Sequence, residues 1–76
     1  MSVVNPEDVL REVVRQFPAS PADIAGRLNM QGGYAIVSIG RVMSSLHQAG
    51  YLQGTQRLGR MIYRPTEKGR SYVSNF

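Results

Sequence analysis

The side chains of this sequence that are best suited to recognition chemistry fall on one predicted helix, over about residues 34–49. Ile39, Met43 and Leu46 recur at helical spacing, so they predict an apolar stripe that faces a core. Arg41 then lies on the opposite, outward side. Its guanidinium suits phosphate oxygens and the O6 and N7 atoms of guanine, because its donors form a planar fork. The other side chains expected on the outward face or its shoulder are Tyr34, Val37, Ser38, Ser44, Ser45 and Gln48.

Most residues that accompany Arg41 on this face are small. The serines at positions 38, 44 and 45 are short enough to let the helix approach a sugar–phosphate backbone closely. Val37 suits contact with a thymine methyl group. The alternative is an ordinary solvated face, but such faces usually carry more Lys and Glu, and serine is a mediocre helix former. The composition of this face therefore favours recognition of a nucleic acid.

A second group of arginines follows the helix, in a predicted hairpin. Arg57 and Arg60 flank its tip and are expected to project beyond the sheet, and Arg64 stands further down the second strand. A narrow DNA minor groove attracts arginine through its enhanced negative potential. The alternative is that these arginines only keep an exposed hairpin soluble.

The hairpin itself is predicted from two short runs with strand character, over about residues 51–56 and 60–64. Because Leu58 followed by Gly59 makes a poor two-residue turn, the sequence predicts a three-residue loop with a left-handed Gly59. Pro65 should end the second strand or lie on an edge, since it cannot continue a central ladder. Two aromatic side chains are expected to pack against each other across the strands, Tyr51 and Tyr63.

The charge of the chain is distributed unevenly. The net charge is +4, and eight of the nine cationic residues are Arg. Six of those cations lie in residues 41–76, where Glu67 is the sole acid, whereas residues 1–40 hold three cations and four acids. A basic half beside a nearly neutral half is typical of a single binding face for a polyanion, with a merely solvated basic surface as the alternative.

Other classes of function find little support in the composition. The sequence has no cysteine, which excludes disulfides and thiolate metal sites. His47 stands alone, and most acids fall in the first turns of helices, where capping explains them. We therefore expect no enzyme, no cofactor and no metal site. The apolar runs are too short for a membrane span, and no signal peptide is visible, so a cytoplasmic location is expected.

The remaining elements have clear start and stop signals. Asn5 is a good N-cap for a first helix that Pro18 ends. Ser20 and Asp23 form a capping box for a second helix over about residues 21–29. The second helix is expected to bury Ile24, Ala25 and Leu28, and the apolar stripe of the first comprises Val9, Leu10, Val13, Val14 and Phe17. Gly50 should end the third helix, and Thr66 should start a final turn or short helix.

Three motifs in this order resemble the winged helix-turn-helix superfamily of bacterial regulators, in the style of the MarR, ArsR and PadR families. The motifs are Ser20–Leu28, Leu46–Leu52 and Met61–Gly69, and the resemblance spans roughly residues 8–70. It implies an α+β fold of three helices, a β-hairpin wing and a short C-terminal turn or helix. The length of 76 residues predicts a single domain over residues 1–76. In that superfamily the third helix enters the major groove of double-stranded DNA, and the wing touches the flanking backbone or the minor groove.

The sequence also departs from the pattern of that superfamily. The segment from Leu28 to Ile39 is four residues longer than is common, which lengthens either the Gly-Gly loop or the third helix. The long flanking helices through which larger members dimerise are not expected here. A homodimer would use the first helix, the tail or the sheet edge, with Val3, Val4, Tyr72, Val73 and Phe76 as its apolar candidates. Two functions fit these patterns, a DNA-binding transcription regulator and a winged-helix module that binds protein.

Overall fold

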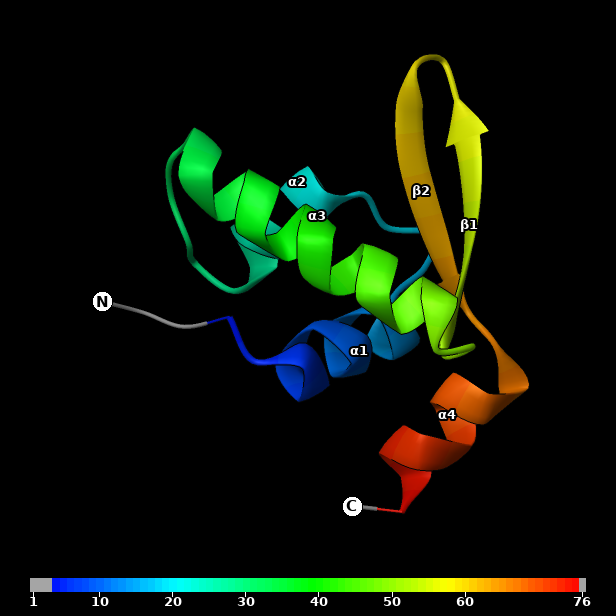
Figure 1. The fold of residues 1–76 in the computed structure, drawn as a ribbon. Helices are drawn as coiled ribbons and strands as arrows, with labels where there is room; N and C mark the ends of the chain where they lie inside the picture. Colours follow the sequence, from blue (N-terminus) through cyan, green and yellow to red (C-terminus); the bar gives the residue numbers. More distant parts are fainter. Residues whose placement is uncertain (1–3, 76) are drawn as a thin grey trace.

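The computed structural model describes residues 4–75 and shows the expected α+β layout of helices followed by a hairpin (Figure 1). The α3 helix crosses in front of α1 and α2, and the hairpin rises beside its C-terminal end (Figure 1). The short α4 helix lies below the hairpin. The elements are α1 (Pro6–Arg15), α2 (Pro21–Arg27), α3 (Gly33–Gln48), β1 (Leu52–Arg57), β2 (Arg60–Pro65) and α4 (Glu67–Ser74).

The first helix starts where the sequence predicts and ends sooner. The side chain of Asn5 accepts a hydrogen bond of 2.9 Å from the backbone N–H of Glu7, which confirms the N-cap. The chain leaves the helix at Gln16, whose φ of −152° is extended. Phe17 therefore falls outside the helical period and is 43% exposed, so its expected place in the apolar stripe is wrong. The buried residues of the helix are Val9, Leu10 and Val13.

The second helix has the predicted capping box. The Ser20 hydroxyl accepts from the backbone N–H of Asp23 at 3.2 Å, and the Asp23 carboxylate accepts from the backbone N–H of Ser20 at 2.9 Å. The helix ends at Arg27, two residues earlier than expected, and Leu28 is half-buried rather than buried. Because Ile24 and Ala25 are buried, α2 packs firmly under α3.

The third helix buries the predicted stripe and gains one residue at its start. Ile39 and Met43 are fully buried and Leu46 nearly so. The longer segment before Ile39 divides into a connection over residues 28–32 and additional helix from Gly33 onward. At the other end Gly50 has a φ of +90°, and the backbone N–H groups of residues 50 and 51 bond back to the carbonyls of residues 47 and 46. This is a Schellman cap, as the glycine predicts.

The hairpin has a tighter turn than the sequence predicts. Its two antiparallel strands pair Leu52 with Pro65 at one end and Arg57 with Arg60 at the other. Only Leu58 and the following glycine remain between the strands, so the expected three-residue loop is wrong. Both turn residues have positive φ, +51° at position 58 and +77° at position 59. Positive φ at both central residues is the signature of the type I′ turn that suits the twist of a hairpin.

The aromatic pair expected across the strands does not form. The register places Gly54 opposite Tyr63, whose ring comes within 3.0 Å of the position that a Cβ on this glycine would occupy. Tyr51 precedes β1 and packs edge-to-face on Tyr72, with ring centroids 5.3 Å apart. Tyr63 is instead buried against the connection between α1 and α2, where it exchanges backbone hydrogen bonds of 2.8 and 3.0 Å with Ala19.

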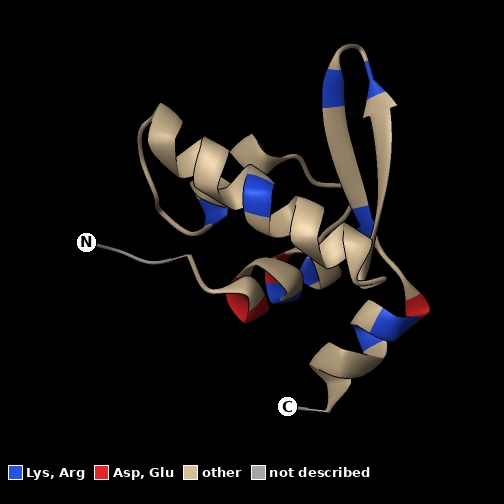
Figure 2. Ribbon diagram, viewed as in Figure 1, with Lys and Arg blue, Asp and Glu red and all other residues tan. Residues whose placement is uncertain are grey.

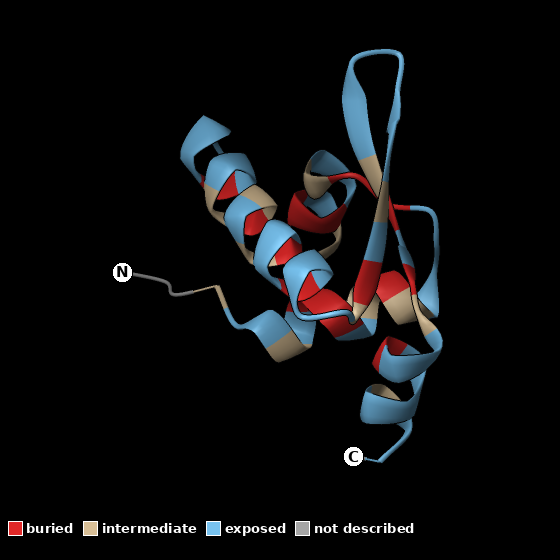
Figure 3. Ribbon diagram, turned by 45° about the vertical axis from the view of Figure 1, so that its right-hand side comes forward, coloured by how far each residue is buried: buried red, intermediate tan, exposed pale blue. Residues whose placement is uncertain are grey.

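The core lies where the three helices meet the base of the hairpin, as the buried segments in Figure 3 show. The fourth helix closes it from below. Thr66 caps this helix through its hydroxyl, which accepts from the backbone N–H of Gly69 at 3.1 Å and donates to the carbonyl of Gly50 at 2.6 Å. The buried core residues are Val9, Leu10, Val13, Ala19, Ile24, Ala25, Ile39, Met43, Leu46, Leu52 and Tyr63.

Candidate nucleic-acid interface

The outward face of α3 is accessible to a partner. Tyr34 and Val37, in the first half of the helix, are 84% and 55% exposed. Ile39 and Met43 lie on the opposite side of the helix, since successive residues are rotated by about 100°, and both are buried. The helical pattern thus places on the surface the residues expected there. Those exposed are Tyr34, Val37, Arg41, Ser44, Ser45 and Gln48, and Ser38 is half-buried on the shoulder.

The arginines of the N-terminal half and Lys68 of α4 have bonding partners inside the protein. Arg27 donates to the backbone carbonyls of Glu12 and Gln16 at 3.3 and 2.8 Å, which satisfies the C-terminal end of α1. Lys68 donates to the carbonyl of Ala49 at 2.9 Å, at the end of α3, and lies over the Tyr51 ring. Two more form ion pairs with acids of the same helix, Arg11 with Asp8 at 3.7 Å and Arg15 with Glu12 at 3.5 Å.

The cations of α3 and the hairpin are exposed and not engaged in this way. Within residues 4–75, their guanidinium groups form neither an ion pair nor a hydrogen bond. Figure 2 shows basic segments on α1, α2, α3, both strands of the hairpin and α4, while the acidic segments in view lie on α1 and at the start of α4. The unengaged arginines on α3 and the hairpin are Arg41, Arg57, Arg60 and Arg64.

The register of the hairpin sorts its side chains into two faces. Directly paired residues point to the same side of a ribbon, and the side alternates along each strand. Arg57 pairs with Arg60, and Arg64 pairs with Gln53, so all three arginines share one face. The opposite face carries the buried Leu52 and Tyr63 and anchors the hairpin to the core. The arginine face therefore points away from the core.

A hollow of about 350 Å³ lies between the hairpin, α2 and α3. Arg60 and Ile36 line it together with Pro21 at the start of α2. Ile36 is 41% exposed at the edge of the apolar stripe and is not among the residues that the sequence predicts for this interface. Only the position of the hairpin shows which surface this side chain borders. The complete lining is Ser20, Pro21, Ala22, Ile36, Arg60 and Met61.

Asp23 follows the lining residue Ala22 in the chain, and its carboxylate is hydrogen-bonded within the capping box of α2. The backbone N–H of Ser20 donates to the Asp23 carboxylate and lowers its pKa below the ordinary value of 3.8. The Ser20 hydroxyl and the positive charges of Arg27 and Arg60 lower it further, against an opposing effect of partial burial. Asp23 is therefore ionised at neutral pH, and its charge is stabilised mainly by the hydrogen bond from the backbone N–H of Ser20.

His47 links the third helix to the hairpin. Its Nδ1 lies 3.0 Å from the carbonyl oxygen of Leu52, and because a carbonyl only accepts, this nitrogen donates. The imidazole also meets the Tyr63 ring edge-on, with centroids 6.3 Å apart. These contacts give the histidine a structural role. Within residues 4–75, no three His, Asp or Glu side chains are grouped so that they could hold a metal ion.

No protein-family model and no curated protein matches the sequence. Among solved structures, Streptococcus pneumoniae FabT in complex with DNA aligns with a TM-score of 0.76 and 12% identity, over 92% of this chain and 48% of that one. The adhesin competence repressor AdcR of Streptococcus pyogenes aligns at 0.74 and 19% identity, over 97% and 55%. A Ralstonia eutropha protein provisionally described as DNA-binding aligns at 0.68 and 22% identity, over 95% of both chains.

These similarities define the class of fold. The chain has the winged helix-turn-helix fold of transcription regulators such as FabT and AdcR, in which α2 and α3 form the helix-turn-helix and β1 and β2 the wing. It spans about half the length of these two proteins. No helix within residues 4–75 has the length and apolar character needed to cross a membrane.

Proposed function

We propose that this protein is a DNA-binding transcription regulator in which residues 1–76 form one winged-helix domain. The main support for the proposal is that some cationic side chains have bonding partners inside the protein and others do not. The arginines of α3 and the wing are exposed and form no ion pair or hydrogen bond within residues 4–75. By contrast, the arginines of α1 form ion pairs with acids of the same helix, and Arg27 of α2 donates hydrogen bonds to backbone carbonyls at the end of α1. Leaving these charges unneutralised raises the potential where a polyanion would bind.

In this proposal α3 lies in the major groove. Arg41 is the only long cationic side chain on its outward face and would bond a guanine edge or a phosphate. Val37 would contact a thymine methyl group. The short polar side chains beside them would let the helix approach the backbone closely, and Tyr34 and Gln48 would act at the two ends of the face. The polar residues concerned are Ser38, Ser44 and Ser45.

The wing would contact the backbone or the minor groove beside the site that α3 reads. Arg57, Arg60 and Arg64 share the face of the hairpin that points away from the core. Three charges on one ribbon neutralise several phosphates without reading base identity, so the wing would supply affinity more than sequence preference.

The experiment that tests the proposal is a titration of duplex DNA at several salt concentrations. Each neutralised phosphate releases counterions and steepens the slope of log affinity against log salt by about 0.9. With several contacts, affinity should fall at least about tenfold between low and physiological salt. A flat response, or no retention on heparin at low salt, would overturn the DNA-binding function.

A second candidate function is a module that binds another protein through α3. It is favoured by the apolar side chains exposed along the first half of that helix, Tyr34, Ile36 and Val37. Winged-helix domains can be reused in this way, because a fold does not determine a function. The heparin and salt experiments separate the two, since an apolar protein interface has little dependence on counterion release.

We also propose that the regulator acts in the cytoplasm, without catalytic activity, and as a homodimer.

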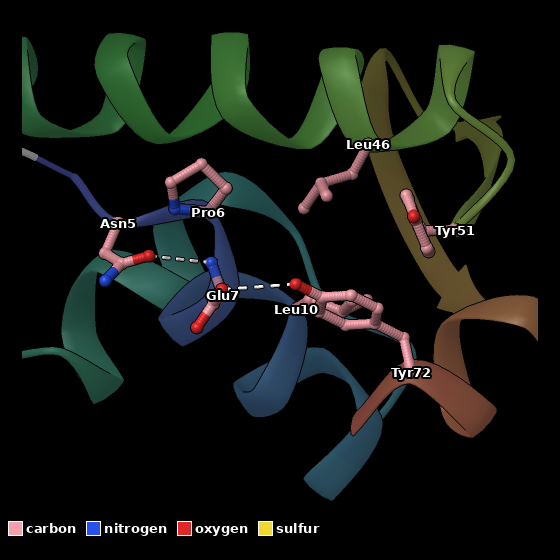
Figure 4. Close-up of a pocket in the computed structure, with 7 residues that line it drawn as sticks. All are labelled: Asn5, Pro6, Glu7, Leu10, Leu46, Tyr51 and Tyr72. Carbon is pink, nitrogen blue, oxygen red and sulfur yellow. Dashed lines mark hydrogen bonds between the residues drawn. The ribbon is translucent and has the colours of Figure 1, made fainter. Parts of the chain in front are cut away.

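The candidate surface for the homodimer lies beside α4. A hollow of about 280 Å³ lies between the start of α1, the end of α3 and α4, and Figure 4 shows its lining. Tyr72 closes one side, and its hydroxyl donates to a carboxylate oxygen of Glu7 at 3.1 Å. Val4 and Val73 pack against the core, which leaves Tyr72 as the exposed apolar candidate among the described residues, while Val3 and Phe76 lie outside them.

A further inference from the structure

The tip of the wing carries the most exposed large apolar side chain of residues 4–75. Leu58 is 101% exposed, so it packs against no other side chain within residues 4–75. The next most exposed apolar residue of the wing, Met61, is only 39% exposed and borders the hollow beside α2. Leu58 therefore contributes nothing to the core.

The backbone at this position also disfavours a leucine. Leu58 is the first central residue of the two-residue turn and has a φ of +51°. This left-handed region is populated mainly by Gly, Asn and Asp, because a longer L side chain crowds the backbone there. Asn-Gly is the preferred sequence for such a turn. Leucine at this position therefore lowers the stability of the turn relative to asparagine.

The residues on either side oppose the hairpin as well. Arg57 and Arg60 are directly paired at the end of the ladder, and like charges in that position repel. Three of the four tip residues thus work against the stability of the hairpin, and Leu58 has no packing within residues 4–75 that offsets this cost. Single exposed apolar residues are common on surfaces, but this one coincides with backbone strain and paired like charges. Such coincidences cluster at functional sites.

We propose that Leu58 is an apolar wedge that enters the DNA minor groove, with Arg57 and Arg60 supplying the charge that draws the wing tip there. This inference rests on the proposed DNA-binding function. An enhanced negative potential in a narrow minor groove attracts arginine. Proteins that bind the minor groove often insert an apolar side chain such as leucine. The absence of any acid at the tip favours this partner over a basic or neutral protein surface.

The test compares two substitutions at one position, with duplex DNA as the probe. Leu58→Asn gives the preferred turn sequence, so the thermal stability of the protein should stay the same or rise. Its affinity for DNA should nevertheless fall about tenfold, because a buried leucine side chain is lost from the complex. Leu58→Met keeps an apolar side chain of similar volume, and its affinity should stay within about twofold of the wild type.

Two further measurements locate the contact. The salt dependence should have the same slope in Leu58→Asn as in the wild type, since no charge is removed. On duplexes saturated with netropsin, which occupies the minor groove, the difference between the two proteins should disappear. A difference that persists there would overturn the minor-groove wedge.

Equal affinity of wild type and Leu58→Asn for DNA, with a steep salt dependence in both, would overturn the wedge and leave the DNA-binding function intact. A wild-type protein that shows no salt-dependent binding would overturn both.

Discussion

Arg57 and Arg60 face each other across the last pair of the wing, on the side of the hairpin that points away from the core. Directly opposed like charges destabilise a two-stranded ribbon, and an anionic partner would relieve this repulsion. In the proposed complex that partner is the phosphate backbone or the minor groove of DNA. The pairing links the local instability of the wing to its proposed contact.

Replacement of both residues, Arg57→Gln and Arg60→Gln, should weaken the salt dependence of DNA binding. Removing two phosphate contacts makes the slope of log affinity against log salt shallower by about 1–2. The fold should be unaffected, because neither guanidinium bonds within residues 4–75. Titrations at four or more salt concentrations measure the slope, and thermal denaturation controls for folding. An unchanged slope would remove the wing from the interface.

Arg41→Ala should impair sequence preference more than nonspecific binding. One bidentate base contact contributes about 1–3 kcal/mol of discrimination against a wrong base. The measurement compares the affinity ratio of a duplex selected from a random pool to an unrelated duplex, before and after the change. Arg11→Ala is the matched control, because that arginine lies on α1 and pairs with Asp8 at 3.7 Å. Equal losses on both duplexes would make Arg41 a phosphate anchor instead.

Self-association is expected at micromolar concentrations. A small domain buries a limited fraction of its surface, so apolar residues at its edge are available for pairing. Tyr72→Ala would remove the ring that packs on Tyr51 and the bond to Glu7, and it should shift the protein toward monomer. Sedimentation with and without DNA measures the change. A monomeric wild type at high concentration under both conditions would contradict the dimer.

Much of the helical part of this fold could be predicted from local signals. The capping box of Ser20 and Asp23 and the left-handed Gly50 act within a few residues, so their types and spacing suffice. The buried stripe of Ile39 and Met43 follows from the helical period alone. The exposed face of α3 is its complement and could be predicted for the same reason.

The hairpin could not be predicted in the same detail, because its register depends on contacts that are distant in the sequence. The backbone bonds between Tyr63 and Ala19, together with the close approach of the Tyr63 ring to Gly54, hold β2 at one register. That register leaves only two residues for the turn and forces Leu58 into the left-handed region. Local turn preferences favour a longer loop, and tertiary packing overrides them. The conflict falls at the wing tip, which is the part of the hairpin proposed to contact DNA. Conflicts between local preference and fold are expected at functional sites.

The capping box of α2 should make stability depend on acid pH. The pKa of Asp23 is lowered in the folded protein, first by the backbone N–H of Ser20, so the ionised carboxylate stabilises the fold. This contribution is complete above the ordinary value of 3.8 and is lost as the pH falls through the lower folded value. Asp23→Ala should destabilise by about 1 kcal/mol at pH 7, typical of a lost cap. Urea denaturation should show a smaller difference from wild type at pH 3 than at pH 7, and an equal difference would contradict the ionised cap.

Two glycines in helices should respond to alanine with opposite signs. Gly69 of α4 is buried, and a Cβ there would collide with the backbone carbonyl oxygen of Tyr51 and meet Leu10 at 3.3 Å. Gly69→Ala should therefore destabilise by about 1–3 kcal/mol, because α4 must shift away from the core. Gly26 of α2 has no atom within 4 Å of such a Cβ, so Gly26→Ala should stabilise by about 0.5–1 kcal/mol through helix propensity. Chemical denaturation of both variants measures the signs. A neutral Gly69→Ala would mean that α4 is held loosely, and that the hollow beside Tyr72 is less defined than its lining indicates.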